Sequence, residues 1–299
     1  MKTNKLFLIV ALLGTVLAGC QKIEKEIDAP EEQPATENVW KLVVQATKDV
    51  DTKALDYDGN QTLDAYWKKG ETVDVYLVGG DKVGTLSVTS DDKVDPATLE
   101  GNIETDGLIV GSNLWLLFPS STDKTWSYLD QDGAAPDEAF DYATASVKVE
   151  TLDEVNKTIT TSTENATFTN QQSVYRFGFK VSESAITVKS FTLSSTENKI
   201  VRTRSFGGND WTSVYGSITA NPTSAPAGNL YFMSVRNENT GSTNNYSFSV
   251  IGSDNALYEG EKAINKQLQN GKLYNASVNI AQKTLAPKST TVSEEMKVL

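Results

Sequence analysis

The sequence has 299 residues but only one cysteine and no histidine. With a single cysteine the chain cannot form an internal disulfide bond, and it has little scope for thiolate chemistry. Histidine is the commonest general base and the commonest metal ligand, so its absence excludes Ser-His-Asp triads, Cys-His pairs and the usual zinc sites. We therefore expect a protein that is not an enzyme and that binds no metal and no cofactor.

Basic residues are also scarce. The 27 lysines and arginines are outnumbered by 39 aspartates and glutamates, which gives a formal net charge of −12. Such an acidic surface disfavours nucleic acid and anionic lipid as partners, and it favours solubility. The acidic segment 56–60 is followed by Gln61 and Trp67 at the positions where a calcium loop has its turn glycine and its bidentate glutamate. The segment 130–133 is followed by Ala134 and Ala135 where ligands and the turn glycine belong, so both segments are interpreted as solvated turns. No pair of carboxylates stands out as a glycosidase acid and base.

The chain also lacks a long hydrophobic run. Its one apolar segment, Leu6 to Leu17, follows Lys2 and Lys5 and is too short to span a membrane as a mature helix. The run Leu-Ala-Gly-Cys ends at Cys20 and matches the bacterial lipobox. This predicts a signal peptide over 1–19, removed before Cys20, and acylation of Cys20 on its thiol and new α-amine, which would attach the protein stably to a membrane. The alternative is an ordinary secretory signal with a chance cysteine.

Residues 20–37 are acidic and contain two prolines and few apolar side chains. This composition predicts a flexible tether between the lipid and a folded part. Acidic residues next to a lipidated cysteine also resemble the surface-export signals of some Gram-negative lipoproteins; a simple solvated tether is the alternative.

Beyond the tether the sequence has the alternation and the turn spacing of an all-β protein. Strands are expected at 38–47, 72–78, 114–118, 174–181, 186–193, 229–235, 246–251 and 274–280, with short helical turns at 134–142 and 262–269. A polar stretch, 153–170, predicts a boundary between two β-sandwich domains, 38–170 and 171–299. The five tryptophans and eleven tyrosines could form a sugar-binding platform, but most are expected in the core of a β-sandwich.

Several short motifs occur in a characteristic order. Thr52, Lys53 and Ala54 precede the segment from Trp67 to Tyr76, which has the pattern W-x-x-G-E-x-V-x-V-Y. Later come Ala-Pro-Ala-Gly before Leu-Tyr-Phe at 225–232, and Gly-Lys-Leu-Tyr before Ser-Val-Asn-Ile at 271–280. With the lipobox, this order resembles the fimbrillin (Mfa-like) family of type V pilin lipoprotein precursors from Gram-negative anaerobes, over nearly the whole chain.

The resemblance implies two tandem transthyretin-like β-sandwiches and a structural subunit of a cell-surface fimbrium. In that family a trypsin-like protease cuts the outer-membrane precursor, its first strand leaves, and the C-terminal strand of the next subunit fills the groove. Here the removed strand would be 38–47, with Trp40, Leu42, Val44 and Ala46 on one side. The cut would fall between Lys53 and Ala54, with Lys48-Asp49 as a second possible site. Many members carry arginine at the cut; this chain has no arginine before Arg176, so an arginine-specific protease could not act there.

The expected donor strand is the tail 290–299, in which Val292, Met296 and Val298 share one side and Glu294 interrupts them. Burying three such side chains would contribute ~5–9 kcal/mol before the cost of ordering the tail. The expected partners are further copies of the chain, other fimbrial subunits, the processing protease, and ligands on host or bacterial surfaces. The alternatives are a non-polymerising anchor or tip subunit, and a monomeric surface lipoprotein that binds glycan.

Overall fold

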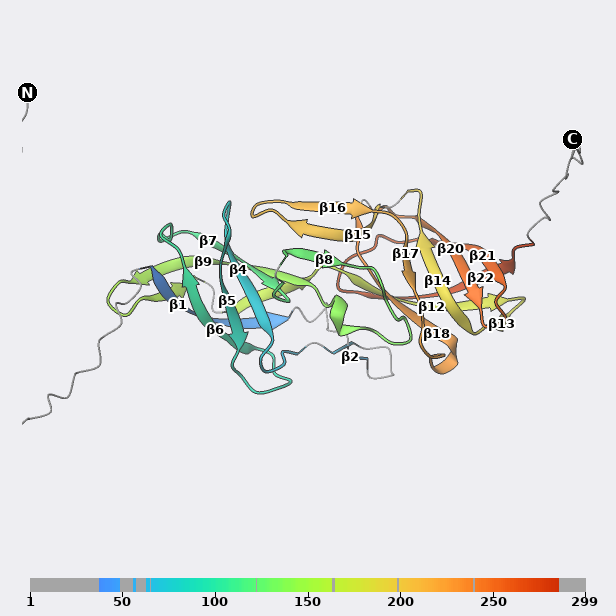
Figure 1. The fold of residues 1–299 in the computed structure, drawn as a ribbon, viewed down its shortest axis with the longest axis horizontal. Helices are drawn as coiled ribbons and strands as arrows, with labels where there is room; N and C mark the ends of the chain where they lie inside the picture. Colours follow the sequence, from blue (N-terminus) through green and yellow to red (C-terminus); the bar gives the residue numbers. More distant parts are fainter. Residues whose placement is uncertain are drawn as a thin grey trace, which may run out of the picture. The chain divides into compact units, whose positions relative to one another are not determined.

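The computed structural model describes residues 38–48, 56–57, 63–64, 66–121, 123–162, 165–197, 199–238 and 240–284. Within these ranges the protein is all-β, as predicted, with two short 3-10 helices and no α-helix (Figure 1). No helix in the described ranges is long and apolar enough to cross a membrane.

The first large sheet closes on itself. Its strands follow the order β10-β1-β11-β9-β7-β4-β5-β6, and the last strand, β6, also pairs with β1, the second strand of this path, which closes the sheet. Gly101 on β6 permits a close approach to β5, because a Cβ atom there would lie 2.2 Å from the Thr85 carbonyl oxygen. The strands of this sheet are β1 (Val39–Lys48), β4 (Thr72–Leu77), β5 (Lys82–Val88), β6 (Ala97–Glu104), β7 (Asn113–Phe118), β9 (Ala143–Asp153), β10 (Thr158–Thr161) and β11 (Asn165–Asn170).

The second large sheet has two open ends. Its strands run β18-β12-β22-β21-β20-β14-β17, with β13 paired to β12. Its members are β12 (Ser173–Val181), β13 (Ser184–Ala185), β14 (Val188–Ser194), β17 (Ile218–Ala220), β18 (Leu230–Val235), β20 (Asn244–Gly252), β21 (Leu257–Ile264) and β22 (Leu273–Gln282).

Shorter elements complete the fold. A small sheet joins β16, β15 and β19, and β8 pairs with β15, which links the first half of the chain to the second. The bounds are β2 (Asp56–Tyr57), β3 (Leu63–Asp64), β8 (Thr125–Ser127), β15 (Lys199–Phe206), β16 (Trp211–Tyr215), β19 (Asn237–Glu238), η1 (Glu138–Phe140) and η2 (Ala227–Asn229).

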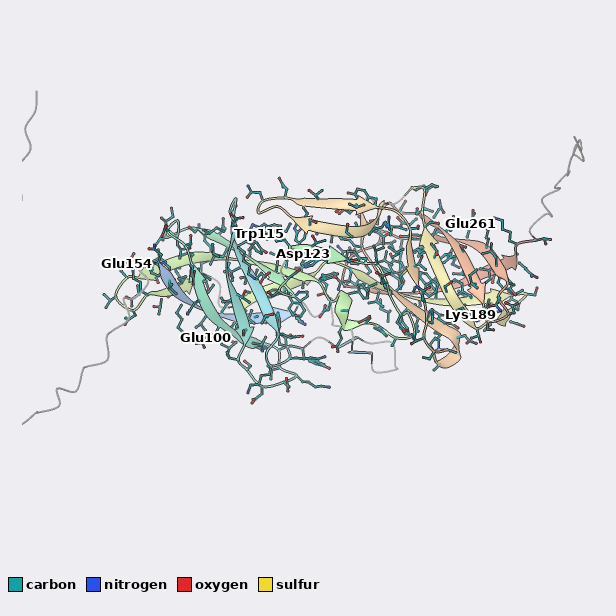
Figure 2. All side chains as sticks on the ribbon, in the orientation of Figure 1. Glu100, Trp115, Asp123, Glu154, Lys189 and Glu261 are labelled. Atoms are coloured by element: carbon teal, nitrogen blue, oxygen red, sulfur yellow. The ribbon has the colours of Figure 1, made fainter. Side chains whose placement is uncertain are left out.

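Two hydrophobic cores follow from this arrangement. One is centred on the closed sheet around Trp67, Leu42 and Phe168, and the other on the aromatic side chains of the second sheet. Figure 2 shows side chains throughout the interior of both cores. The alternation predicted for 174–181 is confirmed, since Tyr175 and Phe177 are both fully buried on one side of β12.

One local expectation needs correction. The segment 262–269 does not form a helical turn, because Lys262 to Ile264 extend β21 and pair with β20. The polar stretch 153–170 contains β10 and β11, which both pair with β1. The domain boundary near Asn170 stays a prediction; β11 ends at Asn170, and β12 begins at Ser173 in a different sheet.

Candidate functional site

The candidate site is β1 together with the strands on either side of it. On one edge β1 pairs with β6 in antiparallel register, from Val39 opposite Glu104 to Ala46 opposite Ala97. On its other edge it runs parallel to β10, with Leu42 next to Ile159, and then parallel to β11, with Thr47 next to Thr167. Among the described strands, β1 therefore completes the ladder between β6 and the β10–β11 segment.

One face of β1 is apolar and buried. Trp40, Leu42, Val44 and Ala46 have exposed fractions of 6%, 0%, 2% and 0%, whereas Lys41, Val43 and Gln45 point outward and are exposed. The predicted inward and outward sides are those observed. Large apolar side chains buried to this degree each contribute ~1.5–3 kcal/mol to the stability of the fold, so this row holds β1 in place. If β1 departed, the apolar side chains that pack against the row would be exposed.

The buried row continues into a charged residue at the end of β1. Lys48 is 2% exposed, and its Nζ atom lies 3.0 Å from Oδ2 of Asp141. The same ammonium group lies 4.7 Å from the ring centroid of Trp67 and 4.4 Å from that of Phe118, within cation–π range. The Lys48 main-chain N–H donates to Oδ1 of Asp95 at 3.1 Å. Lys48 is therefore held by charge, by aromatic faces and through its backbone.

Acidic and basic groups surround the Lys48 ammonium. A cavity of about 30 Å³ is lined by Lys48, Tyr66, Lys68, Glu71, Phe118, Glu138 and Asp141. Burial raises the pKa of the Glu71 carboxyl, and the positive charge of Lys48 partly offsets this. A hydrogen bond to Glu138 raises the pKa of Lys68, which is thereby engaged as an ion pair. Apart from Lys48, the charged residues that line this cavity are three carboxylates and one lysine. The end of the groove in which β1 lies is therefore predominantly acidic without Lys48.

This geometry bears on the second candidate cleavage site. A trypsin-like protease must insert a lysine side chain into its own pocket, and the Lys48 side chain is 1% exposed within a paired strand. Lys48 is therefore inaccessible in the folded protein, and Lys53 stays the predicted site.

The remaining predicted site residues lie outside the described ranges. They are Cys20, Lys53, Ala54, Val292, Met296 and Val298. The roles assigned to them stay predictions.

The sequence reasoning missed Lys48 and Asp141 as a buried pair. One signal was present: Lys48 continues the i, i+2 series of Trp40, Leu42, Val44 and Ala46 by one further inward position. Its partner could not be found in this way, because Asp141, which follows a 3-10 helix, is 93 residues away from Lys48 in the sequence.

The aromatic residues do not form an exposed platform in the described ranges. Trp67, Trp126 and Tyr128 are buried in ring clusters, and Tyr215, at 40%, is the one aromatic among the large hydrophobic residues that are exposed. This agrees with the expectation that most aromatic side chains would be core residues. Within the same ranges, no group of three or more acidic or cysteine side chains is placed to hold a metal ion.

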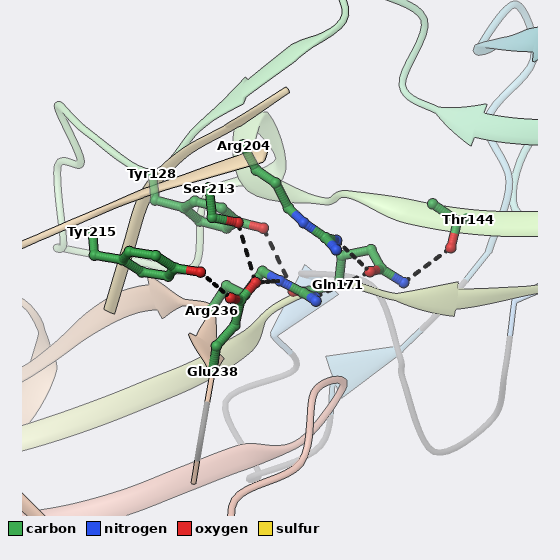
Figure 3. A network of polar contacts seen from close by, with 8 residues as sticks. All are labelled: Tyr128, Thr144, Gln171, Arg204, Ser213, Tyr215, Arg236 and Glu238. Carbon is green, nitrogen blue, oxygen red and sulfur yellow. Dashed lines mark hydrogen bonds and ion pairs between the residues drawn. The ribbon is translucent and has the colours of Figure 1, made fainter. Parts of the chain in front are cut away.

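A second polar cluster lies where β11 passes into β12 (Figure 3). Nη1 of Arg204 and Nη1 of Arg236 both donate to Oε1 of Gln171 at 3.0 Å, and Tyr215 donates to Glu238. The pKa of Arg204 is lowered to about 10, mainly by burial and to a smaller extent by repulsion from the positive charge of Arg236. The side chains of this cluster hydrogen-bond to one another and fix the junction between β11 and β12, so we interpret the cluster as structural.

Comparison with known proteins gives structural similarity only. No family model matches the chain, and no curated protein matches it. Solved structures similar to it include a candidate cell adhesion protein from Bacteroides uniformis, at 12% identity and a TM-score of 0.43, covering 81% of this chain and 96% of that one. The tip fimbrial protein Mfa3 from Porphyromonas gingivalis, with a C-terminal truncation, is 10% identical with a TM-score of 0.36, covering 74% and 80%.

A fimbrial assembly protein from Parabacteroides distasonis is also similar, at 9% identity and a TM-score of 0.36, covering 83% of this chain and 99% of that one. These solved structures are thus described as cell adhesion and fimbrial proteins. Because each TM-score is below 0.5, the functional proposal depends on the sequence motifs and on the geometry of β1.

Proposed function

We propose that this protein is the precursor of a fimbrial subunit at the cell surface, and that it assembles by exchanging β1 for the tail of a neighbouring subunit. The observation that supports this most directly is the position of β1. It is the first strand of the chain that the structure describes, yet it pairs along both edges with strands that are distant in sequence and buries an apolar row between them.

Removing such a strand would leave a groove of one strand's width. The edges of β6 and of β10–β11 would present unpaired main-chain groups, and the surface beneath Trp40, Leu42 and Val44 would be exposed to water. A donor strand that restores both ladders and the apolar contacts would regain the free energy lost, which is the basis of strand addition between chains.

The other parts of the proposal follow from the sequence. A lipid on Cys20 would deliver the precursor to the outer membrane, and a trypsin-like protease would cut between Lys53 and Ala54. The released fragment would then carry the lipid, the tether and β1. Further copies of the chain and other fimbrial subunits are the proposed partners.

Limited digestion with trypsin tests this proposal. The digested protein should begin at Ala54 and form ladders on denaturing gels that are run without boiling. Lys53→Gln should prevent both, whereas Lys69→Gln, at an exposed lysine, should change neither. Deletion of residues 290–299 should abolish the ladders while leaving the cut intact. Ladders that persist after this deletion would show that the tail is not the donor.

A non-polymerising anchor is the second candidate. It is favoured by the buried Lys48–Asp141 pair, which adds a specific attachment at the end of β1. In an anchor, the fragment ending at Lys53 would stay bound to the rest of the protein after the cut. Size-exclusion chromatography of the digested protein distinguishes the two candidates, since the anchor elutes as one monomeric species that contains both fragments.

A further inference from the structure

The end of the groove that Lys48 occupies constrains any strand that replaces β1. The Asp141 side chain is 7% exposed, and among the residues that the structure describes none forms a hydrogen bond with its Oδ1. If a strand without a cation at this position replaced β1, the carboxylate would be buried again without a partner charge, and a buried ion pair that has lost one partner is strongly destabilising. Lys68 lines the same cavity but is already paired with Glu138. A replacement strand is therefore best served by a lysine or arginine at this position.

The tail that follows Pro287 contains two lysines, Lys288 and Lys297. If Lys288 takes the place of Lys48, a strand that runs opposite to β1 brings Thr290 to the place of Ala46 and Val292 to the place of Val44. The row then continues with Glu294 and Met296 in the places of Leu42 and Trp40. In this register a lysine takes the place of Lys48, the small residue Thr290 takes the place of the small residue Ala46, and a valine takes the place of Val44.

The other lysine gives a poorer fit. With Lys297 beside Asp141 and the tail in the direction of β1, Glu295 and Ser293 take the places of Ala46 and Val44. Those two positions are 0% and 2% exposed, and they are lined by apolar residues. Polar side chains buried there without partners lose free energy, so this direction is disfavoured.

Resting on the strand exchange proposed above, we propose that the tail of a second copy enters in the direction opposite to β1, with Lys288 beside Asp141. The new strand then runs parallel to β6 and antiparallel to β10 and β11, the reverse of the β1 pairings. Glu294 is the one ill-matched residue of the row. It takes the place of Leu42, which is 0% exposed, so this register buries one carboxylate, as the register through Lys297 does with Glu295. The proposed register differs in that Val292 and Met296 keep two of the inward places apolar.

The two lysines of the tail provide a matched pair of variants. Lys288→Met should speed the release of subunits from the polymer by roughly 100-fold or more, because it leaves Asp141 unpaired. Lys297→Met should change the rate less than about twofold, since an exposed charge contributes little. The rate is measured as loss of ladders over time in dilute denaturant. The inference is wrong if the Lys297 variant is the more sensitive one or if the two behave alike.

Engineered disulfides test the direction independently. After a cut at Lys53 the remaining chain contains no cysteine. In the proposed register Ser289 takes the place of Thr47, which lies next to Thr167 on β11. Oxidation should therefore join Ser289→Cys of one copy to Thr167→Cys of the next, since neighbouring strand positions lie within disulfide range. In the opposite direction Met296 occupies that place, so Met296→Cys is the matched control.

The outcomes separate this inference from the proposal on which it rests. Cross-linking through position 289 but not through 296 supports the reversed direction. Polymers that cross-link through position 296 overturn the inference and leave strand exchange standing. A cut protein that forms no polymer overturns both.

Discussion

β1 and β12 have the same pattern of neighbours, although one is proposed to leave the fold and the other remains. β1 has an antiparallel partner, β6, on one edge and parallel partners, β10 and β11, on the other. β12 has an antiparallel partner, β18, and a parallel partner, β22. Pairing along both edges therefore does not decide whether a strand can be exchanged.

The two strands differ in how their ends and faces are fixed. β12 follows β11 after two residues, and one of these, Gln171, is held by Arg204 and Arg236 (Figure 3). Its inward row is aromatic, with Tyr175, Phe177 and Phe179 fully buried. The inward side chains of β1 after Trp40 are aliphatic and smaller, and the strand ends at the Lys48–Asp141 ion pair. A strand of another chain that carries a lysine at this position can reproduce that ion pair. The comparison suggests that an exchangeable strand is one whose contacts a second segment can supply.

The largest expected effect comes from truncating each strand at its centre. Phe177→Ala should lower the free energy of unfolding by ~3–5 kcal/mol in both the precursor and the assembled polymer, because β12 belongs to both. Leu42→Ala should cost the precursor ~2–5 kcal/mol and leave the polymer unchanged, because β1 is no longer there. Denaturant unfolding of both forms measures these differences. An equal effect of Leu42→Ala in the polymer would show that β1 is retained.

Alternation in the sequence could identify the buried rows but not the neighbours of each strand. The rows of β1 and β12 were predictable, because every second residue is apolar. The closure of the first sheet through β1 was not, since it depends on contacts between residues such as Val39 and Glu104 that are far apart in sequence. The helical turn expected at 262–269 failed because pairing of Ile264 with Asn244 outweighs the local helical spacing. The buried Lys48 was hidden for a related reason, since its partner lies on a distant segment.

A smaller effect is expected at the charged end of β1, which has no counterpart among the aromatic residues of β12. Lys48→Met should cost the precursor about 3 kcal/mol, because it leaves the Asp141 carboxylate buried without its cation while the methionine keeps much of the apolar contact of the lysine stem. Adding Asp141→Leu should recover most of this loss, since no charge is then left unpaired. Denaturant unfolding of the two variants measures the recovery. If the double variant loses as much free energy of unfolding as the Lys48→Met and Asp141→Leu single variants lose together, the two residues do not act as a pair.

The smallest expected effect is a pH dependence confined to the β1 side of the comparison. Burial raises the pKa of Glu71 in the folded protein, so the folded state binds its proton more tightly than the unfolded state does. This group therefore favours folding at low pH, and its contribution declines as the pH rises from the ordinary glutamate value of ~4.5 through the raised one. Glu71→Gln should flatten the decline, so that its stability relative to the natural protein is greater at pH 7 than at pH 4.5. Glu150→Gln, at an exposed position on β9, is the matched control. Thermal unfolding across this range measures both, and equal slopes for the two variants would mean that the pKa of Glu71 is not raised in the folded protein.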